Sequence, residues 1–484
     1  MAKQVSPGVL ALRKVVDDVY ADAREAKKQG KLVGWSSSKF PCELAEAFDL
    51  NVMYPENQAA GIAAQRDGEI MCQAAEDLGF DNDICGYARI SLAYAAGKRA
   101  SRKFDPETLE FIIDPNSGKP LKDENGKVVI DPETGKPKKD PKTQVPYTVL
   151  DDIHEIEALP ETTEKEIAYK NFRREAIKPY KQMRIPQPDF VLCCNNICNC
   201  MTKWYEDIAR RHNIPLIMID VPYNEFDHVN EANVKYIRSQ LDTAIRQMEE
   251  ITGKKFDEDK FEQCCQNANR TAKAWLKVCD YLQYKPAPFN GFDLFNHMAD
   301  VVTARGRVEA AEAFELLAKE LEQHVKEGTT TAPFKEQHRI MFEGIPCWPK
   351  LPNLFKPLKA NGLNITGVVY APAFGFVYNN LDELVKAYCK APNSVSIEQG
   401  VAWREGLIRD NKVDGVLVHY NRSCKPWSGY MPEMQRRFTK DMGIPTAGFD
   451  GDQADPRNFN AAQYETRVQG LVEAMEANDE KKGK

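Results

Sequence analysis

The sequence predicts an α/β protein with two Rossmann- or flavodoxin-like βαβ domains, each built on a parallel sheet. A unit of apolar strand, loop, amphipathic helix and second strand occurs twice, at residues 188–222 and 413–452. Short strands joined through a helix form parallel pairs with right-handed crossovers. The remaining chain is strongly helical, apart from one turn-rich segment. We therefore expect a helical N-terminal and connector region and a surface hairpin insertion beside the two domains.

The N-terminal region begins with a predicted amphipathic helix over residues 11–29. Its apolar residues recur at helical spacing on one side, at Leu12, Val15, Val16 and Val19. A short strand is expected at Lys31–Gly34, followed by a Ser-rich loop and a second strand near Val52. Pro41 suits the first turn of a helix between these two strands.

Residues 105–145 have a different character. A segment with the pattern Asp-Pro-x-x-Gly-Lys-Pro occurs at 114–120 and again at 131–137, with short apolar pieces between. Such clusters of Pro, Gly and Asp are typical of turns that flank short strands. The segment is predicted to be a surface insertion with one or two hairpins.

The two repeated units each place cysteine in a loop after a strand. In the first, a strand at Phe190–Cys194 precedes Cys198, a helix at 202–211 and a strand at Leu216–Asp220. Ligands of open α/β sheets bind at the carboxyl ends of the strands.

The second unit repeats this order. A strand at Gly415–His419 leads to Cys424, a helix beginning near Pro432 and a further strand after Pro445. The two units are therefore expected to bring their cysteines to a common cleft.

Residues 230–330 carry helical patterns, and a third βα pattern occupies Gly367–Tyr388. These patterns divide the chain into three predicted domains. They are an N-terminal α/β region with the insertion (1–150), the first cysteine unit with its helical connector (151–335), and the second cysteine unit (336–484).

Composition excludes several classes of protein. The net charge is −7 with both signs interspersed, which argues against a nucleic-acid-binding groove. No stretch approaches the roughly 18 uninterrupted apolar residues of a membrane span. The first residues lack the pattern of a secretion signal, so a cytoplasmic location is expected. A Gly-x-x-x-x-Gly-Lys-Ser/Thr phosphate loop is also missing, so we expect no unaided ATP hydrolysis.

Thirteen cysteines in a long cytosolic chain are more typical of buried thiols, ligands or catalysts than of disulfides. Those within helical patterns are interpreted as small apolar residues: Cys72, Cys264, Cys265, Cys279 and Cys389. At least one of Cys193 and Cys194 should face the core, and Cys347 is undecided. Loops or element ends hold the remaining candidates, Cys42, Cys85, Cys198, Cys200 and Cys424.

The cysteine spacing by itself does not identify a metal. The run Cys194-x3-Cys198-x-Cys200 matches no ferredoxin pattern, and Met201 departs from the spacing of radical enzymes that bind S-adenosylmethionine. The seven histidines are scattered, which argues against zinc. Inert buried thiols and a cluster held by distant cysteines both remain possible from spacing alone.

Three segments resemble motifs of the 2-hydroxyacyl-CoA dehydratase family, which also includes benzoyl-CoA reductase subunits. They are DNDICGYARISLAYAAG (81–97), CCNNICNCMTKWYE (193–206) and VDGVLVHYNRSCKPWSGYMPEM (413–434). GWSSSKFPCELAEAF and YPENQAAG match as well. The resemblance extends through nearly the whole chain, with the 105–145 insertion outside it.

The resemblance implies an oxygen-sensitive lyase that removes water from a 2-hydroxyacyl-CoA by syn elimination. The proton to be removed is on the β carbon, which the thioester does not acidify. The family injects one electron to form a ketyl radical anion, which expels the hydroxide and makes that proton acidic. The resemblance assigns a [4Fe-4S] cluster to Cys85, Cys198 and Cys424, with one iron corner open for the substrate.

The same resemblance implies two partners and a further cofactor. The partners are a smaller homologous beta subunit, which forms a heterodimer with this chain, and an activator with its own [4Fe-4S] cluster that delivers the electron at the expense of ATP. A flavin, FMN or riboflavin, is a further expectation. Cys42 and Cys200 remain reserve ligands.

Three residues in the N-terminal loops are predicted to act on the substrate. By resemblance, Glu56 takes the β proton or binds the hydroxyl, and Ser37 and Ser38 hydrogen-bond the hydroxyl or the carbonyl. The alternatives are a solvated turn residue for Glu56 and a helix cap for Ser37. Arg89, Lys203 and Lys425 lie near the motifs without an assigned role. A benzoyl-CoA-reductase-type subunit and a non-catalytic electron-relay subunit with a fully ligated cluster remain alternatives.

Overall fold

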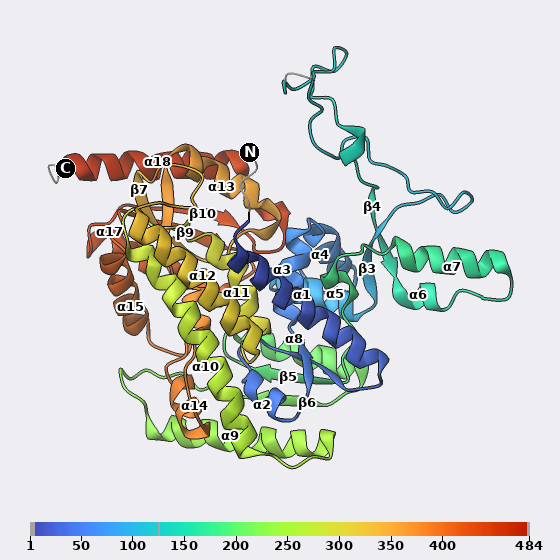
Figure 1. Ribbon diagram of the computed structural model, residues 1–484, viewed down its shortest axis with the longest axis horizontal. Coiled ribbons are helices and arrows are strands. Elements are labelled where there is room, and N and C mark those ends of the chain that lie inside the picture. The colour runs from blue at the N-terminus through green and yellow to red at the C-terminus, as the bar shows by residue number, and fades with distance from the viewer. Residues whose placement is uncertain (1–4, 124–125, 482–484) are drawn as a thin grey trace.

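The computed structural model describes residues 5–123 and 126–481, and it confirms the α/β class. Figure 1 shows two sheet-centred halves side by side, with helices around them. The first sheet is parallel, in the order β2-β1-β5-β6. Its strands are β1 (Val33–Ser36), β2 (Asn51–Met53), β5 (Phe190–Cys194) and β6 (Leu216–Ile219). This sheet therefore takes two strands from residues 1–150 and two from residues 151–335.

The second sheet is also parallel and has the order β10-β9-β7-β8. Its strands are β7 (His338–Glu343), β8 (Leu363–Val368), β9 (Gly415–Asn421) and β10 (Thr446–Gly451). The predicted strands did not include β7, which pairs with both β8 and β9 inside the sheet. The strand sequence HRIMFE includes the polar residues His338, Arg339 and Glu343, so it lacks the continuous apolar run of the strands in the repeated units, although five of its six residues are buried.

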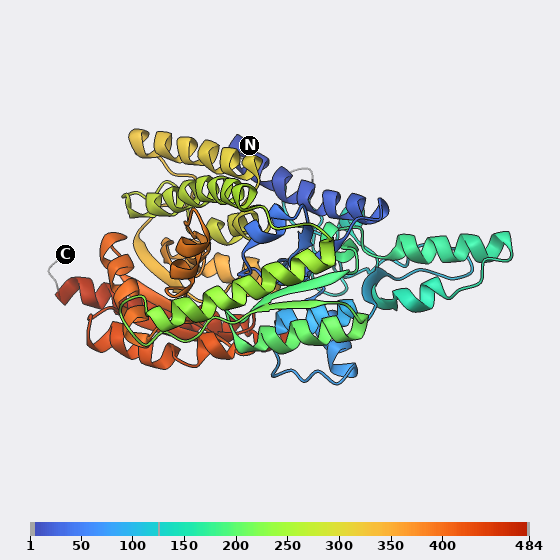
Figure 2. The ribbon, with the colours of Figure 1, turned by 90° about the horizontal axis from the view of Figure 1, so that it is seen from below.

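Helices from distant parts of the sequence pack over the two sheets. α1 (Pro7–Lys28) contacts α11 (Asp293–Thr303) and α12 (Val308–Glu327), while α10 (Glu258–Asp280) packs on α12. Figure 2 shows α1, α10 and α12 layered on one side of the molecule. The remaining helices of the connector and the first half are α2 (Cys42–Ala47), α3 (Pro55–Ala64), α4 (Gly68–Asp77), α5 (Gly86–Ala95), α8 (Asn199–His212) and α9 (Glu231–Thr252).

The second half carries its own helices and ends in a long one. They are α13 (Leu351–Ala360), α14 (Leu381–Tyr388), α15 (Ile397–Asp410), α16 (Lys425–Ser428), α17 (Met431–Lys440) and α18 (Ala461–Lys481). None of the helices in the described residues combines the length and apolarity needed to cross a lipid bilayer.

The insertion projects away from the body, as Figure 1 shows. The insertion connects the antiparallel strands β3 (Lys98–Arg102) and β4 (Thr148–Asp152), and the helices α6 (Ile153–Glu157) and α7 (Glu164–Ala176) follow β4. Isolated antiparallel bridges join its turns, and none of its described residues is buried. The predicted surface insertion is confirmed, with residues 124 and 125 outside the described part.

Most predicted elements are present, with shifted ends. β1 begins at Val33 rather than Lys31, and α8 begins at Asn199 rather than Thr202 because Cys198 is its N-cap residue. α17 begins one residue before the predicted Pro432. The third βα pattern is also found, but β8 begins at Leu363, four residues before the predicted start.

Close packing between the N-terminal and C-terminal regions gives a first prediction. A Cβ on Gly68 would lie 2.1 Å from the backbone oxygen of Ala454, so Gly68→Ala must separate α4 from the 452–455 loop. We expect a loss of about 1–3 kcal/mol in the free energy of unfolding, measured by urea denaturation. Gly470→Ala is the control, because that helical glycine faces open space. Unfolding of both variants at the same urea concentration would contradict this prediction.

Candidate functional site

Four cysteines from separate parts of the chain line one cavity of about 1060 Å³, called here the cysteine cavity. They are Cys85, Cys198, Cys200 and Cys424. Cys198 and Cys200 follow β5 of the first sheet, and Cys424 follows β9 of the second. The carboxyl ends of the two parallel sheets therefore meet at this cavity.

Three of these cysteines immediately precede a helix. Cys85 is the N-cap residue of α5, Cys198 of α8 and Cys424 of the short α16. Backbone N–H groups of the first turns, at Ala88, Met201 and Trp427, donate to these sulfur atoms and lower the pKa of the three thiols against the larger effect of burial. The first-turn N–H groups of the longer helices α5 and α8 also favour negative charge, which suits thiolates.

The cysteines influence one another electrostatically. Burial raises the pKa of the Cys85 thiol well above its usual value, and negative charge on Cys200, Cys424 and Cys198 adds to the effect. Burial likewise raises the pKa of Cys198 to about 11 and of Cys424 to about 12. Several of these cysteines can be ionised together only if positive charge compensates them, as a metal does.

The donor set fits an iron–sulfur cluster better than a single ion. No three His, Cys, Asp or Glu side chains in the described residues converge on a point where they could share one metal ion. Each thiolate of a cubane binds a different iron atom, so a cluster does not require that convergence. Four thiols lining one cavity match this requirement in chemistry.

Two contacts hold Cys85 and Cys200 in place. The side-chain amide of Gln453 donates to Cys85 Sγ at 3.2 Å. The backbone N–H of Cys85 donates to the Cys200 thiol, which lowers its pKa against the larger effect of burial. Cys200 is thus a fourth thiol beside the three predicted ligands.

The other cysteines lie outside the cysteine cavity. Cys42, Cys72, Cys193, Cys194, Cys265, Cys279, Cys347 and Cys389 are buried, and Cys264 is half-buried on α10. Cys347, undecided from sequence, has its sulfur 3.4 Å from His419 Nε2 within the core. Cys42 is buried at the start of α2, away from the four cavity cysteines.

Glu56 and Ser38 meet at a second cavity. The backbone N–H and the hydroxyl of Ser38 each donate to Glu56 Oε1 at 2.9 Å, and the Tyr205 hydroxyl donates to Oε2. Burial raises the pKa of the Glu56 carboxyl, and these hydrogen bonds partly oppose the rise. The carboxyl group is therefore both fixed in orientation and more basic than an exposed glutamate.

Ser37 has a different environment from Ser38. Its hydroxyl is fully buried and accepts a hydrogen bond of 2.8 Å from the Cys194 backbone N–H. Its own N–H donates to the Leu192 carbonyl at 2.8 Å. Ser37 therefore extends the pairing of β1 with β5 and lines neither cavity, whereas Ser38 and Glu56 lie together.

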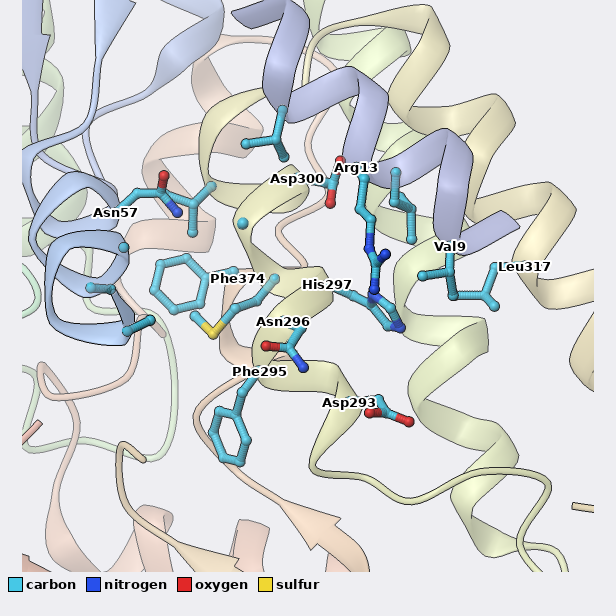
Figure 3. A pocket seen from close by; sticks show the side chains of 18 of the residues that line it. Val9, Arg13, Asn57, Asp293, Phe295, Asn296, His297, Asp300, Leu317 and Phe374 are labelled. Carbon is cyan, nitrogen blue, oxygen red and sulfur yellow. The ribbon is translucent and has the colours of Figure 1, made fainter. Parts of the chain in front are cut away.

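The second cavity, of about 900 Å³, lies beside α11 and is called here the α11 cavity. Figure 3 shows polar and apolar side chains of this cavity, with Asn296, His297 and Asp300 on α11 and Asn57 on the opposite side. Tyr370 and Phe374 line both this cavity and the cysteine cavity.

Tyr370 and Phe374 mark the junction of the two cavities. The pKa of the Tyr370 phenol is raised by burial and further by negative charge on Cys424 and Glu56. This phenol is therefore close to both the acid and the cysteines. Cys85 and Cys198 influence its pKa in the same direction, so Glu56 and these three thiols all lie near one aromatic side chain.

Comparison with known proteins assigns the family. A family model described as 2-hydroxyglutaryl-CoA dehydratase, D-component, matches residues 157–475. The chain belongs to this family. The family resemblance and the hydro-lyase class predicted from the motifs are thereby confirmed.

Relatives of this family cover between 60% and 100% of the chain. The (R)-2-hydroxyglutaryl-CoA dehydratase subunit alpha of Acidaminococcus fermentans is 85% identical over 484 residues, all of both chains. The (R)-phenyllactyl-CoA dehydratase alpha subunit of Clostridium sporogenes is 44% identical over 97% of this chain and 96% of its own. A benzoyl-CoA reductase subunit of Thauera aromatica is more distant, at 25% identity over 60% of this chain and 71% of its own.

The three basic residues without an assigned role, Arg89, Lys203 and Lys425, lie in different surroundings. Arg89 is buried and paired with Asp455 at 3.0 Å and Glu76 at 2.8 Å, which gives it a structural role. Lys203 is exposed and pairs with Glu206. Lys425 lines the cysteine cavity and lies 3.5 Å from Asp83.

Tyr205 and Tyr370 are site residues that were not predicted from the sequence. Tyr205 stands within the quoted cysteine motif, one helical turn after Met201, so its place on the inner face of α8 was a usable signal. Tyr370 follows β8 in a segment without a motif, and no sequence signal places it between the cavities.

The hydrogen bond from Tyr205 gives a second prediction. Tyr205→Phe removes a donor that stabilises the ionised carboxylate, so the pKa of Glu56 should rise further. Infrared titration of the carboxyl C=O band, assigned by difference from Glu56→Gln, measures the shift. Tyr20→Phe is the matched control, because the Tyr20 hydroxyl donates to the neighbouring Asn57 instead. An unchanged midpoint in Tyr205→Phe would show that this hydroxyl does not control Glu56.

Proposed function

We propose that this chain is the alpha subunit of an oxygen-sensitive [4Fe-4S] dehydratase that converts (R)-2-hydroxyglutaryl-CoA to glutaconyl-CoA in anaerobic glutamate fermentation. The observation that carries the proposal is the junction at Tyr370 and Phe374, where the α11 cavity, lined by the half-buried acid Glu56, adjoins the cavity lined by four thiols. The name of the 85% identical relative supports the substrate. The proposed reaction is a syn elimination of water through substrate ketyl radicals.

Cys85, Cys198 and Cys424 are the proposed ligands of the cluster. When bound, a [4Fe-4S] cluster with an open iron corner supplies one-electron chemistry and a Lewis acid at the substrate oxygen. The protein supplies half-buried thiols from three elements that are distant in the sequence. Since the ligands come from both sheets, the site exists only when the two halves of the chain are docked.

Glu56 is the proposed base for the β proton. Its burial makes the carboxylate a stronger base than an exposed glutamate, and Ser38 and Tyr205 hold its two oxygens in a fixed orientation. In a syn elimination the proton and the hydroxyl leave from the same face of the substrate. Glu56 lies at the junction that adjoins the thiols, so it can take the proton from the face on which the hydroxyl leaves.

The α11 cavity is the proposed site of the thioester tail. Its apolar walls and its scattered amide, imidazole and carboxyl groups suit a flexible chain that contains amides. Arg13 and Lys181 also line it and would attract phosphate groups. The thioester would then reach the junction beside Glu56.

The proposed assembly has further members. The alpha-subunit names of the relatives imply a multi-subunit complex. We propose that this complex contains a smaller homologous beta subunit and receives its electron from an ATP-dependent activator with its own [4Fe-4S] cluster. FMN or riboflavin is a proposed additional cofactor of the complex.

Cys200 favours a second candidate function. A fourth thiol beside Cys85 would allow a fully ligated cluster, as expected for an electron-relay subunit. In that case no iron corner would be open to substrate. Removal of Cys200 distinguishes the two functions, because only the relay requires it as a ligand.

The ligand assignment gives a third prediction. Cys85→Ser, Cys198→Ser and Cys424→Ser should each lose most of the iron and sulfide of the anaerobically purified complex, together with dehydration of 2-hydroxyglutaryl-CoA. Cys200→Ser should keep both, and Cys264→Ser on α10 is the control outside the cavity. Iron and sulfide analysis with EPR spectra provides the measurement. Full iron and full activity in Cys424→Ser would refute the assignment.

The proposed base gives a fourth prediction. Glu56→Gln should lower kcat by about 10²- to 10⁴-fold while the complex keeps its iron. The native rate should rise with pH through a pKa above the usual carboxyl range, because only the ionised Glu56 accepts the proton. That limb of the pH profile should disappear in Glu56→Gln and persist in Glu69→Gln, an exposed control on α4. A retained limb in Glu56→Gln would assign the base to another residue.

A further inference from the structure

Lys39 is a buried lysine in the wall of the cysteine cavity. It directly follows Ser38 in the loop after β1, and its exposed fraction is 3%. The ammonium nitrogen lies 3.9 Å from the ring centroid of Phe376 and 4.3 Å from that of Phe374. It donates one hydrogen bond, to the carbonyl oxygen of Ala373.

The ammonium of Lys39 has no carboxylate partner in the described part of the chain. Its contacts are the Ala373 carbonyl and the two aromatic rings, and the titratable groups that influence its pKa are Arg305 and Cys194. Burial lowers the pKa of Lys39, and the positive charge of Arg305 lowers it further. An ammonium has three donors, so two remain for a ligand.

Most other buried cations in the described residues are paired with acids, whereas Arg99 donates to the carbonyls of Tyr94 and Lys98 instead. Arg305 binds Glu43 through two nitrogens, at 2.7 and 3.1 Å, and Arg404 binds Glu343 at 2.8 Å. Arg89 and Arg339 also have carboxylate partners. Lys39 departs from this pattern, although a buried charge without a counterion is costly.

The position of Lys39 relates it to the reacting centre. Phe374, whose ring contacts the ammonium, lines both cavities and so belongs to the junction beside Glu56. Lys39 therefore contacts a ring that also lines the place proposed for the reacting carbons. In a five-carbon diacid thioester, three bonds separate the hydroxyl-bearing carbon from the distal carboxylate carbon, a reach of about 4 Å when extended.

We propose that Lys39 binds the distal carboxylate of the acyl chain and thereby selects a diacid thioester over a thioester with an apolar acyl chain. This inference rests on the proposed function. The carboxylate supplies the missing counterion, and the two phenylalanine rings shield the pair from water. The other cations of the cysteine cavity are already engaged: Arg404 by Glu343, and the largely exposed Lys425 by Asp83.

Equilibrium binding tests the inference without turnover. Glutaryl-CoA and pentanoyl-CoA have the same chain length, lack the hydroxyl, and differ in the distal carboxylate. Isothermal titration of the native complex should show about 10- to 100-fold tighter binding of glutaryl-CoA, the range expected for a charge-assisted hydrogen bond. Lys39→Met should abolish this preference by weakening glutaryl-CoA alone, and Lys39→Arg should retain part of it.

The outcomes separate this inference from the proposed function. If the native complex binds both thioesters equally, or if the preference survives in Lys39→Met, Lys39 does not select the diacid and the inference is overturned, while the dehydratase proposal stands. If the native complex binds neither thioester, the inference and the dehydratase proposal both fail. Loss of the preference in Lys425→Met but not in Lys39→Met would assign the carboxylate to Lys425 and overturn the inference.

A comparison of kcat/KM for two substrates distinguishes selection by Lys39 from a purely structural effect of the substitution. Lys39→Met should lower kcat/KM for 2-hydroxyglutaryl-CoA by about 10- to 100-fold and leave kcat/KM for 2-hydroxypentanoyl-CoA unchanged. Equal losses for both substrates would mean that Lys39 only maintains the fold, which overturns the inference. Methionine replaces the lysine chain with a neutral chain of similar shape, and Lys39→Gln provides a second neutral variant.

Discussion

The site depends on one constraint, the meeting of the carboxyl ends of two parallel sheets. Each sheet alone presents a loop with cysteine, at Cys198 after β5 and at Cys424 after β9. Neither loop encloses a cavity without the other. The extensive packing of α1 on α11 and α12, and of the 452–455 loop on α4 and α5, holds the two halves in this arrangement. Local unfolding at this contact would therefore separate the cysteines before either sheet is lost.

Burial determines the chemistry at the junction. It raises the pKa of Glu56 and of the cavity thiols, and it lowers the pKa of Lys39. All three shifts disfavour charge in the empty cavity, so a ligand that brings the opposite charge gains most from binding there. Metal ions would compensate the thiolates, and a carboxylate would compensate the ammonium. The cavity is thus suited to a positively charged cluster core and an anionic acyl chain at different points of its wall.

Hydrogen bonds assign different roles to neighbouring serines. Ser37 continues the β1–β5 ladder through its contacts with Cys194 and Leu192, and Ser38 turns outward to Glu56. Both serines follow the end of β1, and the chain turns at Ser38, so the two side chains point to different surroundings. The rigid ladder behind Ser38 fixes the position of its hydroxyl, and through it the orientation of the Glu56 carboxyl.

The sequence by itself determined the fold class, the repeated βαβ units, the surface insertion and the family, because hydrophobic periodicity, turn residues and motifs are local properties of the chain. It also placed Cys198 and Cys424 in loops after strands and Cys85 in a loop or at the end of an element, whereas Glu56, predicted in a loop, lies in the first turn of α3. Tertiary structure alone decided that β7 lies inside the second sheet, that Cys200 joins the other thiols, and that Lys39 faces the cavity without an acid. These features depend on which distant segments pack together, and packing across hundreds of residues leaves no periodic signal in the sequence.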